Sequence, residues 1–295
     1  MKGDGDLMVK NCYSFDIGEF ECLAVSDGTF NYQNPAELLF PDVSKVELKR
    51  ICKEHDIRLE KWKNWLSDYI CLVINTGDEL ILIDTGAGKD DISSPETGLL
   101  LDNLETEGFL PSDFDRVIIS HVHPDHIGGV TSKDNRLVFT DSEFILWKDE
   151  WDFWTSSRVE DELKGYFKHE LIECARNNLP PIKHRVNLID QEMEIVPGLK
   201  IFEAKGHTPG QIAISVSTDD DELIYFSDSF IHPIHVERPD WYTAIDLNPE
   251  QAVKTRCNIL NQASNGETLL FGFHFPFPGL GYLKKKENRF FWSSI

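Results

Sequence analysis

The spacing of apolar residues changes along the chain from period two to helical spacing and back. Alternating positions at 15–30 predict an opening hairpin that ends in the Asp27-Gly28 turn, and two apolar runs within 69–88 predict a second hairpin. Other apolar runs bounded by turn residues predict strands at 117–119 and 135–140, on both sides of 206–210, before Asp228 and after Glu267. The pattern therefore indicates a protein with many short strands.

Helical spacing separates these strands in several places. The stretch 35–65 predicts a helical insertion that either flanks the mouth of a site or simply packs on the core. Asn248, Pro249 and Gln251 form a typical helix start. We expect its apolar face to be Val253, Cys257 and Leu260, and we expect further helices at 97–109, 142–154 and 158–176.

Three tryptophans, Trp147, Trp151 and Trp154, fall at helical spacing within the predicted helix 142–154. Such a stripe is typical of a core face, although one of its rings could line a substrate pocket.

The length of 295 residues and an apolar fraction of 41% predict one domain, 1–295, with a substantial core. There is no apolar run long enough for a membrane span and no apolar signal core at the start, so we expect a cytoplasmic protein with no membrane partner. Six scattered cysteines without a CxxC motif argue against a disulfide framework or a cysteine zinc site.

The charge balance bears on the class of partner. Lys and Arg number 29 against 51 acidic residues, which gives a formal net charge of −22. Because a groove for nucleic acid must neutralise phosphates, we expect no nucleic-acid partner, and we expect the basic run 284–286 to be a solvated loop instead of a phosphate clamp. A small-molecule substrate is the expected partner, and a homodimer stays open.

The highest density of possible metal ligands follows the apolar run 117–119. His121, His123, Asp125 and His126 place four possible metal ligands within six residues, with Pro124 between them. Side chains two apart in extended or turn geometry project to the same side, so His121 and His123 can reach one ion. Asp125 and His126 lie further round the turn and indicate a second ion beside the first.

The stretch Ser-His-Val-His-Pro-Asp-His-Ile-Gly-Gly at 120–129 resembles the metal-binding signature of the metallo-β-lactamase-fold hydrolases. The resemblance implies an α+β, four-layer αββα sandwich with two metals at one edge, and three further ligands downstream. His207 in a Gly/Pro turn, Asp228 after an apolar run and His274 match these positions. The implied ligand sets are His121, His123 and His207 for one ion, Asp125, His126 and His274 for the other, and Asp228 shared.

Two further features refine the resemblance. Asp84 ends an apolar run and is either a plain turn residue or an acceptor that orients a ligand histidine, and the family pattern favours the second role. The stretch 274–281 is similar to the branch that contains methyl-parathion hydrolase and related esterases and lactonases.

The resemblance predicts a dinuclear metal hydrolase that uses a bridging hydroxide to cleave a small ester, lactone or phosphotriester. Zinc is the expected metal, with manganese or iron as alternatives, and Asp125 is expected to handle the proton of the attacking water as well as to ligate. No GxSxG nucleophile motif is present. The competing hypotheses are a di-iron redox enzyme of the same fold, a nucleic-acid phosphodiesterase and a non-catalytic metal-binding module.

The stretch 230–242 follows Asp228 and should lie beside the metals. His169 and His184 have no ligand-like neighbours and are expected at the surface. The candidates for an apolar, aromatic-lined substrate pocket, each of which could equally be ordinary packing, are His232, His235, Trp241, Tyr242, Phe275 and Phe277.

Overall fold

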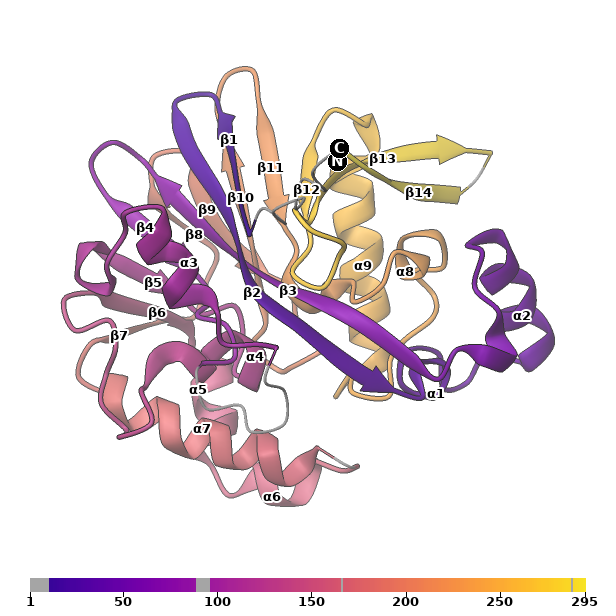
Figure 1. The fold of residues 1–295 in the computed structure, drawn as a ribbon, viewed down its shortest axis with the longest axis horizontal. Helices are drawn as coiled ribbons and strands as arrows, with labels where there is room; N and C mark the ends of the chain where they lie inside the picture. The colour runs from indigo at the N-terminus through magenta and orange to yellow at the C-terminus, as the bar shows by residue number, and fades with distance from the viewer. Residues whose placement is uncertain (1–10, 89–95, 166, 288) are drawn as a thin grey trace, which may run out of the picture.

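The computed structural model describes residues 11–88, 96–165, 167–287 and 289–295, so the first ten residues of the expected domain lie outside it. Its strands form two seven-stranded sheets (Figure 1). The first sheet has the order β1-β2-β3-β4-β5-β6-β7 and consists of β1 (Cys12–Ile17), β2 (Phe20–Gln33), β3 (Asn64–Asn75), β4 (Leu80–Ile83), β5 (Arg116–Ile118), β6 (Glu143–Trp147) and β7 (Val186–Ile189). The second has the order β14-β13-β12-β11-β10-β9-β8 and consists of β8 (Met193–Val196), β9 (Leu199–Glu203), β10 (Ile212–Ser217), β11 (Glu222–Tyr225), β12 (Leu269–Phe271), β13 (Leu280–Lys286) and β14 (Arg289–Ser294).

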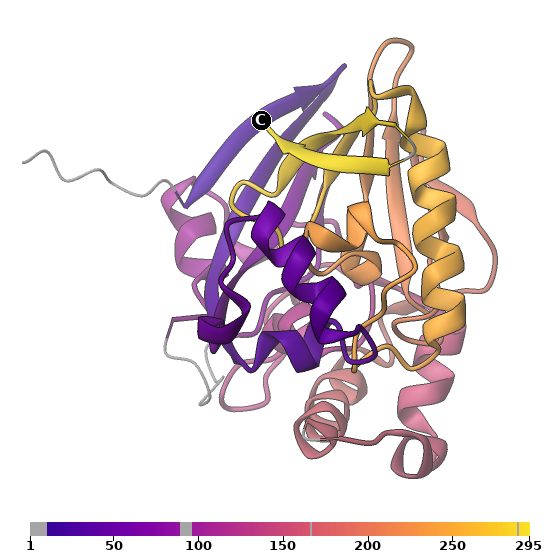
Figure 2. The same cartoon turned by 90° about the vertical axis from the view of Figure 1, so that its right-hand side faces the viewer.

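Helices lie outside the two sheets. Figure 2 shows α9 on the outer side of the second sheet, and α3 packs against β2 on the outer side of the first. The predicted four-layer αββα sandwich is therefore confirmed. The helices are α1 (Pro35–Leu39), α2 (Lys45–Glu54), α3 (Leu100–Thr106), α4 (Pro124–Ile127), α5 (Lys148–Thr155), α6 (Arg158–Glu162), α7 (Lys168–Ile182), α8 (Ile234–Glu237) and α9 (Pro249–Gln262).

The main core lies between the sheets and takes side chains from both. Val117 and Ile118 of β5 are fully buried, as are Ile81 and Leu82 of β4, so buried apolar residues follow one another directly along these strands. Such runs are typical of parallel strands covered on both faces, and β4, β5, β6 and β7 do pair in parallel.

The topology collects the predicted site residues at one edge of the sandwich. Asp84 follows β4, the stretch 121–126 follows β5, Asp228 follows β11 and His274 follows β12. The pairs β4–β5 and β11–β12 are parallel, so within each pair the two strands end at the same edge.

The opening hairpin is shifted from its predicted position. The turn between β1 and β2 lies at Gly18, whereas Asp27 and Gly28 lie inside β2 at an irregularity in its pairing with β3. Glycine is required at position 28 for a reason other than a hairpin turn. Gly28 has φ 109°, and a Cβ on it would come within 1.9 Å of the Glu96 carbonyl oxygen. Asp27 is fully buried and accepts hydrogen bonds from the backbone N–H groups of Ala87, Gly98 and Leu100.

The predicted strand 135–140 is wrong, because this stretch is irregular apart from one bridge between Thr131 and Leu137. The strand is β6, which takes the first part of the predicted helix 142–154, and α5 begins only at Lys148. Pairing with both β5 and β7 makes β6 a central strand, and this tertiary constraint overrides the local helical spacing.

Two other helix predictions need correction. The helix expected at 158–176 is two helices, α6 and α7, and α7 continues through Pro180 and Pro181. Helix α9 begins as predicted, with the Asn248 side chain accepting from the Gln251 N–H. Its expected apolar face is only partly right: Leu260 is buried, Val253 is half-buried and Cys257 is exposed, and Ala252, Thr255, Arg256 and Ile259 complete the buried face.

The predicted helical stretch 35–65 consists of α1, α2 and a short 3₁₀ turn, and β3 begins at Asn64. Figure 1 shows α1 and α2 at one end of the long strands β2 and β3. Their apolar side chains form a separate cluster with the stretch 231–241, in which Leu39, Phe40 and Ile51 contact residues such as Ile234 and Trp241. None of the helices in the described ranges is long and apolar enough to cross a membrane.

Candidate metal centre

The loop after β5 carries four of the predicted site residues. His123 is the N-cap of α4 and Pro124 is its first residue, so Asp125 and His126 lie in the first turn of that helix. His121 and His126 are fully buried, and His123 and Asp125 nearly so. The backbone is extended at His123, and Pro124 then starts the helix. This change of direction lets side chains on both sides of Pro124 point toward the same cluster.

The first donor group is formed by His121, His123, His207 and Asp228, whose ligand atoms lie within 4.8 Å of one another. His123 Nδ1 is 3.0 Å from both His121 Nε2 and His207 Nε2. Asp228 Oδ2 is 3.3 Å from His207 Nε2. Four donors from three loops are therefore arranged around one small volume.

The second donor group is formed by Asp125, His126 and His274. Asp125 Oδ2 is 3.4 Å from His274 Nε2 and 3.8 Å from His126 Nε2. Asp228 also reaches this group, with Oδ1 3.1 Å from His126 Nε2 and Oδ2 3.1 Å from His274 Nε2. The structure thus brings together all seven residues, and Asp228 lies between the two groups.

The outward ring nitrogens of these histidines have partners of their own. His126 Nδ1 donates to Asp84 at 2.7 Å, which is the contact expected for Asp84, and Asp84 also accepts from the Ser120 N–H at 2.7 Å. His207 Nδ1 donates to Asp246 at 2.9 Å. The remaining two contacts are His274 Nδ1 with Ser67 Oγ at 3.0 Å and His121 Nδ1 with Ser120 Oγ at 3.2 Å.

Burial and neighbouring charges set the ionisation of the cluster. Burial lowers the pKa of His121 and of His123 well below the usual value, which keeps both rings neutral. Burial acts in the same direction on His207, but hydrogen bonds to Asp228 and Asp246 outweigh it and raise the His207 pKa to about 9. Burial would raise the pKa of Asp228, but the rings of His274 and His126 hold it well below the usual value.

The donor set fits divalent cations. Imidazole nitrogens and carboxylate oxygens are the ligands that such ions take in proteins, and the groups here are buried at one point. Among the residues that the structure describes, His126 Nε2 and Asp228 Oδ1 are buried and face each other at 3.1 Å, but neither atom makes a hydrogen bond. Buried polar atoms without a partner are costly, and a cation between them would satisfy both.

The predicted pocket residues are distributed over several environments. His232 lies among Phe40, Trp62 and Trp65, with ring centroids 5.7–6.0 Å away. His235 donates through Nε2 to the Leu39 carbonyl. Trp241 packs in the cluster with α1 and α2. Phe275 packs against Phe226 and Trp292 in the cluster on the outer side of the second sheet. Phe277 is half-buried against the main core, and Tyr242 is half-buried.

Further aromatic and acidic residues surround the donors, and of these the sequence singled out only Trp154. Trp65 has its ring 6.4 Å from that of His274, and Trp154 has its ring 5.8 Å from that of His123. Trp154 is the one member of the predicted tryptophan stripe that reaches the site. Asp246, Ser67 and Glu150 also contact the donor loops, and no local motif distinguishes them from ordinary polar residues.

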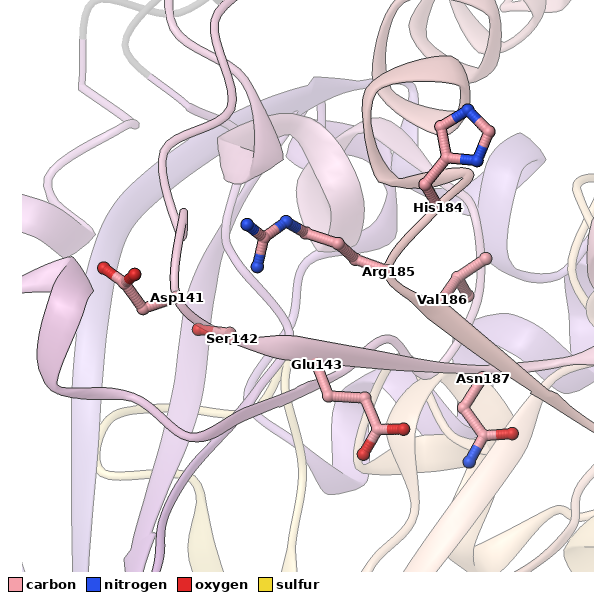
Figure 3. A pocket seen from close by; sticks show the side chains of 7 residues that line it. All are labelled: Asp141, Ser142, Glu143, His184, Arg185, Val186 and Asn187. Carbon is pink, nitrogen blue, oxygen red and sulfur yellow. The ribbon is translucent and has the colours of Figure 1, made fainter.

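A surface hollow lies elsewhere on the molecule (Figure 3). Its lining includes Glu143, the first residue of β6, which pairs with Arg116 at the start of β5. The donor loop leaves the opposite end of β5, so this hollow is separate from the candidate metal centre. His184, which lines it, is exposed, as is His169, in agreement with the sequence.

Comparison with protein families gives a match to the metallo-beta-lactamase superfamily over residues 70–256, well over half of the chain. The chain belongs to this superfamily. The match contains the loop 121–126, His207 and Asp228, and the superfamily assignment agrees with the two-sheet architecture of the model.

Two solved structures are similar to this chain over nearly its full length. One is AidC, a dizinc quorum-quenching lactonase in complex with a product, with 30% identity, a TM-score of 0.86 and coverage of 97% of each chain. Another is the hydrolase AbOPH, with 25% identity, a TM-score of 0.85 and coverage of 97% of this chain and 98% of that one. Both superpose on nearly the full length.

The curated relatives match over a shorter stretch. An N-acyl homoserine lactonase of Bacillus cereus is 25% identical over an alignment 171 positions long, which covers 52% of this chain and 60% of the relative. The chain thus spans less than two thirds of the length of that relative.

Proposed function

We propose that this chain is a dinuclear metal-dependent hydrolase. His121, His123 and His207 would hold one divalent cation, Asp125, His126 and His274 the other, and Asp228 would be shared. The observation that carries the proposal is the arrangement of two donor groups around Asp228, whose two oxygens lie 3.1 Å from His126 Nε2 and from His274 Nε2. Zinc is the first candidate, since the similar lactonase AidC is described as dizinc, and manganese and iron are alternatives.

The residues behind the donors prepare them for this role. Asp84 and Asp246 accept from the Nδ1 atoms of His126 and His207, which fixes the tautomer and directs the Nε2 lone pair inward. When bound, the two cations supply a water molecule of lowered pKa and polarise the substrate carbonyl. Asp125 Oδ2 lies in the same cluster of ligand atoms, 3.4 Å from His274 Nε2, and is placed to accept the proton that the attacking water loses.

The substrate that we propose is a small, uncharged lactone or ester, with an N-acyl homoserine lactone as the first candidate. Hydrolysis adds water across the ring C–O bond and gives a hydroxy acid. Similarity to AidC over nearly the whole chain and to the Bacillus cereus lactonase over part of it supports this class. The net charge of −22 disfavours polyanionic substrates such as nucleic acids.

The aromatic surroundings of the centre support an uncharged substrate as well. Trp65 lies between His274 and His232, and Trp154 lies beside His123. Such rings provide apolar surface next to the polar reaction centre, which is the usual composition of a small-molecule site. Of the pocket residues expected from the sequence, we retain His232 as a lining residue, because it contacts Trp65. A homodimer stays a prediction.

The test combines metal content with hydrolysis. Protein purified without chelator should contain about two zinc, manganese or iron ions per chain and should open N-acyl homoserine lactones. Asp228→Ala should lose at least one ion together with the activity, because the shared carboxylate is removed. Asp220→Ala is the matched control, since Asp220 is an exposed carboxylate in the β10–β11 turn.

The outcomes separate the alternatives. A wild-type protein that stays free of metal after reconstitution would rule out the dinuclear hydrolase. Two bound ions with cleavage only of aryl esters or phosphotriesters would keep the hydrolase and change its substrate. Iron with visible absorption and no hydrolysis of any of these substrates would favour the redox alternative.

A further inference from the structure

Glu150, near the start of α5, is a fully buried carboxylate that touches two of the donor loops. Its Oε1 accepts from the backbone N–H of Val122 at 2.9 Å, and Val122 lies between His121 and His123. Its Oε2 accepts from the backbone N–H of Gly210 at 2.8 Å, three residues after His207. One side chain therefore joins a loop of the first sheet to a loop of the second.

A third hydrogen bond extends this contact to an aromatic ring. Trp154 Nε1 donates to Glu150 Oε1 at 2.7 Å, one turn along α5. The Trp154 ring lies 5.8 Å from that of His123 at an angle of 81°. Glu150 thus contacts the backbone beside His123 and also fixes the ring that packs on it.

The loop after β9 fits against α5 without spare room. A Cβ on Gly210 would lie 2.2 Å from the Glu150 backbone nitrogen, and a Cβ on Gly206 would lie 2.2 Å from the backbone nitrogen of Ala252 in α9. Only glycine allows both approaches. The loop that carries His207 is therefore held between α5 and α9, and Glu150 bonds to it at Gly210, where the loop meets α5.

The carboxylate is held by N–H dipoles. Within the described ranges, no lysine or arginine forms an ion pair with Glu150, and its two oxygens interact with two backbone N–H groups, the Trp154 indole and the Thr208 side chain. Burial raises its pKa. A buried carboxylate of this kind is costly unless several donors satisfy it, and here the donors belong to the segments that carry the site.

We propose that Glu150 is a positioning residue that acts on the first donor group, His121, His123 and His207, as a whole. This inference rests on the proposed dinuclear centre. Glu150 contacts the segments carrying all three histidines, whereas in the second group His126 is oriented by Asp84 and His274 by Ser67. Loss of Glu150 should therefore weaken one metal position much more than the other.

The test is a titration of metal-free protein with cobalt(II) chloride, followed by the visible absorption of the bound ion. In Glu150→Gln one oxygen becomes an N–H₂ group, which faces an N–H donor of either Val122 or Gly210. The wild type should bind two equivalents. We expect the variant to bind one equivalent as the wild type does and the other about 10–100-fold more weakly, the usual effect of losing a residue that orients a ligand.

Two further variants complete the design. Gly210→Ala should produce the same selective loss, because its Cβ pushes the His207 loop away from α5 while Glu150 is intact. Asp152→Asn makes the same change of charge at an exposed position of α5 and should titrate as the wild type does. The thermal midpoint of each metal-free variant reports whether its fold is retained.

Three results would overturn the inference about Glu150: wild-type affinity at both positions in Glu150→Gln, wild-type titration of Gly210→Ala, or equal weakening of both positions. A wild-type protein that binds no cobalt would instead overturn the proposed function itself. The two failures are therefore distinguishable in one experiment.

Discussion

Asp246 accepts a hydrogen bond from His207 Nδ1 at 2.9 Å and from Arg256 at 2.8 Å, and both of these partners are buried. Arg256 lies in α9, and its other nitrogens donate to the carbonyl oxygens of Ser229 and Trp241. The candidate ligand His207 is thus tied through one carboxylate to a fully buried guanidinium. This chain links the metal centre to the packing of α9.

Replacement of Asp246 should affect metal binding and folding together. Asp246→Ala leaves the buried Arg256 without its carboxylate partner, so we expect the free energy of unfolding to fall by about 3–5 kcal/mol. Metal affinity should fall about 10–100-fold, because His207 loses the group that fixes its tautomer. Urea unfolding and metal titration measure the two effects. Asp240→Ala, at an exposed ion pair with Arg238, is the control, and an equal effect there would contradict the prediction.

The Trp65 ring, which lies beside the second donor group, should contribute to substrate binding. Trp65→Ala removes the ring that lies 5.7 Å from His232 and 6.4 Å from His274. We expect KM for an N-acyl homoserine lactone to rise about tenfold, equivalent to about 1.4 kcal/mol, with the metal content unchanged. Leu66→Ala is a matched control, because Leu66 is the next residue on β3 and is 61% exposed. An unchanged KM for Trp65→Ala would remove this ring from the substrate site.

The contact between α2 and α8 should depend on pH. His55 Nε2 lies 2.7 Å from Glu237 Oε1, and the hydrogen bond to Glu237 raises the His55 pKa despite its partial burial. A raised histidine pKa gives stability that is complete below the unfolded pKa of about 6.5 and is lost as pH rises through the folded pKa.

The wild type should therefore exceed His55→Gln in free energy of unfolding by up to about 1 kcal/mol near pH 5.5, and the difference should shrink toward pH 9. Thermal unfolding of both proteins across this range measures it. His169→Gln, at an exposed position, should show no such trend. A difference that grows with pH would contradict the assigned sign.

Removal of metal should destabilise the folded protein. Chelation leaves His126 Nε2 and Asp228 Oδ1 buried without a hydrogen bond, and addition of zinc should reverse this. A free ion at 100 times its Kd should add about 2.7 kcal/mol to the free energy of unfolding for each site. Calorimetry of chelated and zinc-loaded protein tests this, with magnesium, a poor match for histidine nitrogens, as the control ion. An unchanged midpoint on loading would contradict it.

The donor loop could be predicted because its signal is local. His121, His123, Asp125 and His126 lie within six residues after an apolar strand, and Pro124 marks the turn. Asp228 and His274 also follow apolar strands, so the family pattern was sufficient to choose them. The strand at 143–147 could not be separated from the helix that follows, because helical spacing continues across both and only pairing with β5 and β7 distinguishes them.

The sequence by itself determined which side chains can ligate a metal and at which strand ends they lie, since both depend on residue type and short-range spacing. Only the tertiary structure decided what orients them. Ser67 meets His274 across 207 residues, Asp246 meets His207 across 39, and Glu150 meets Val122 across 28. Contacts of this kind form when the two sheets pack and their loops meet at one edge. The sequence around a single polar residue does not indicate which distant residue it will contact.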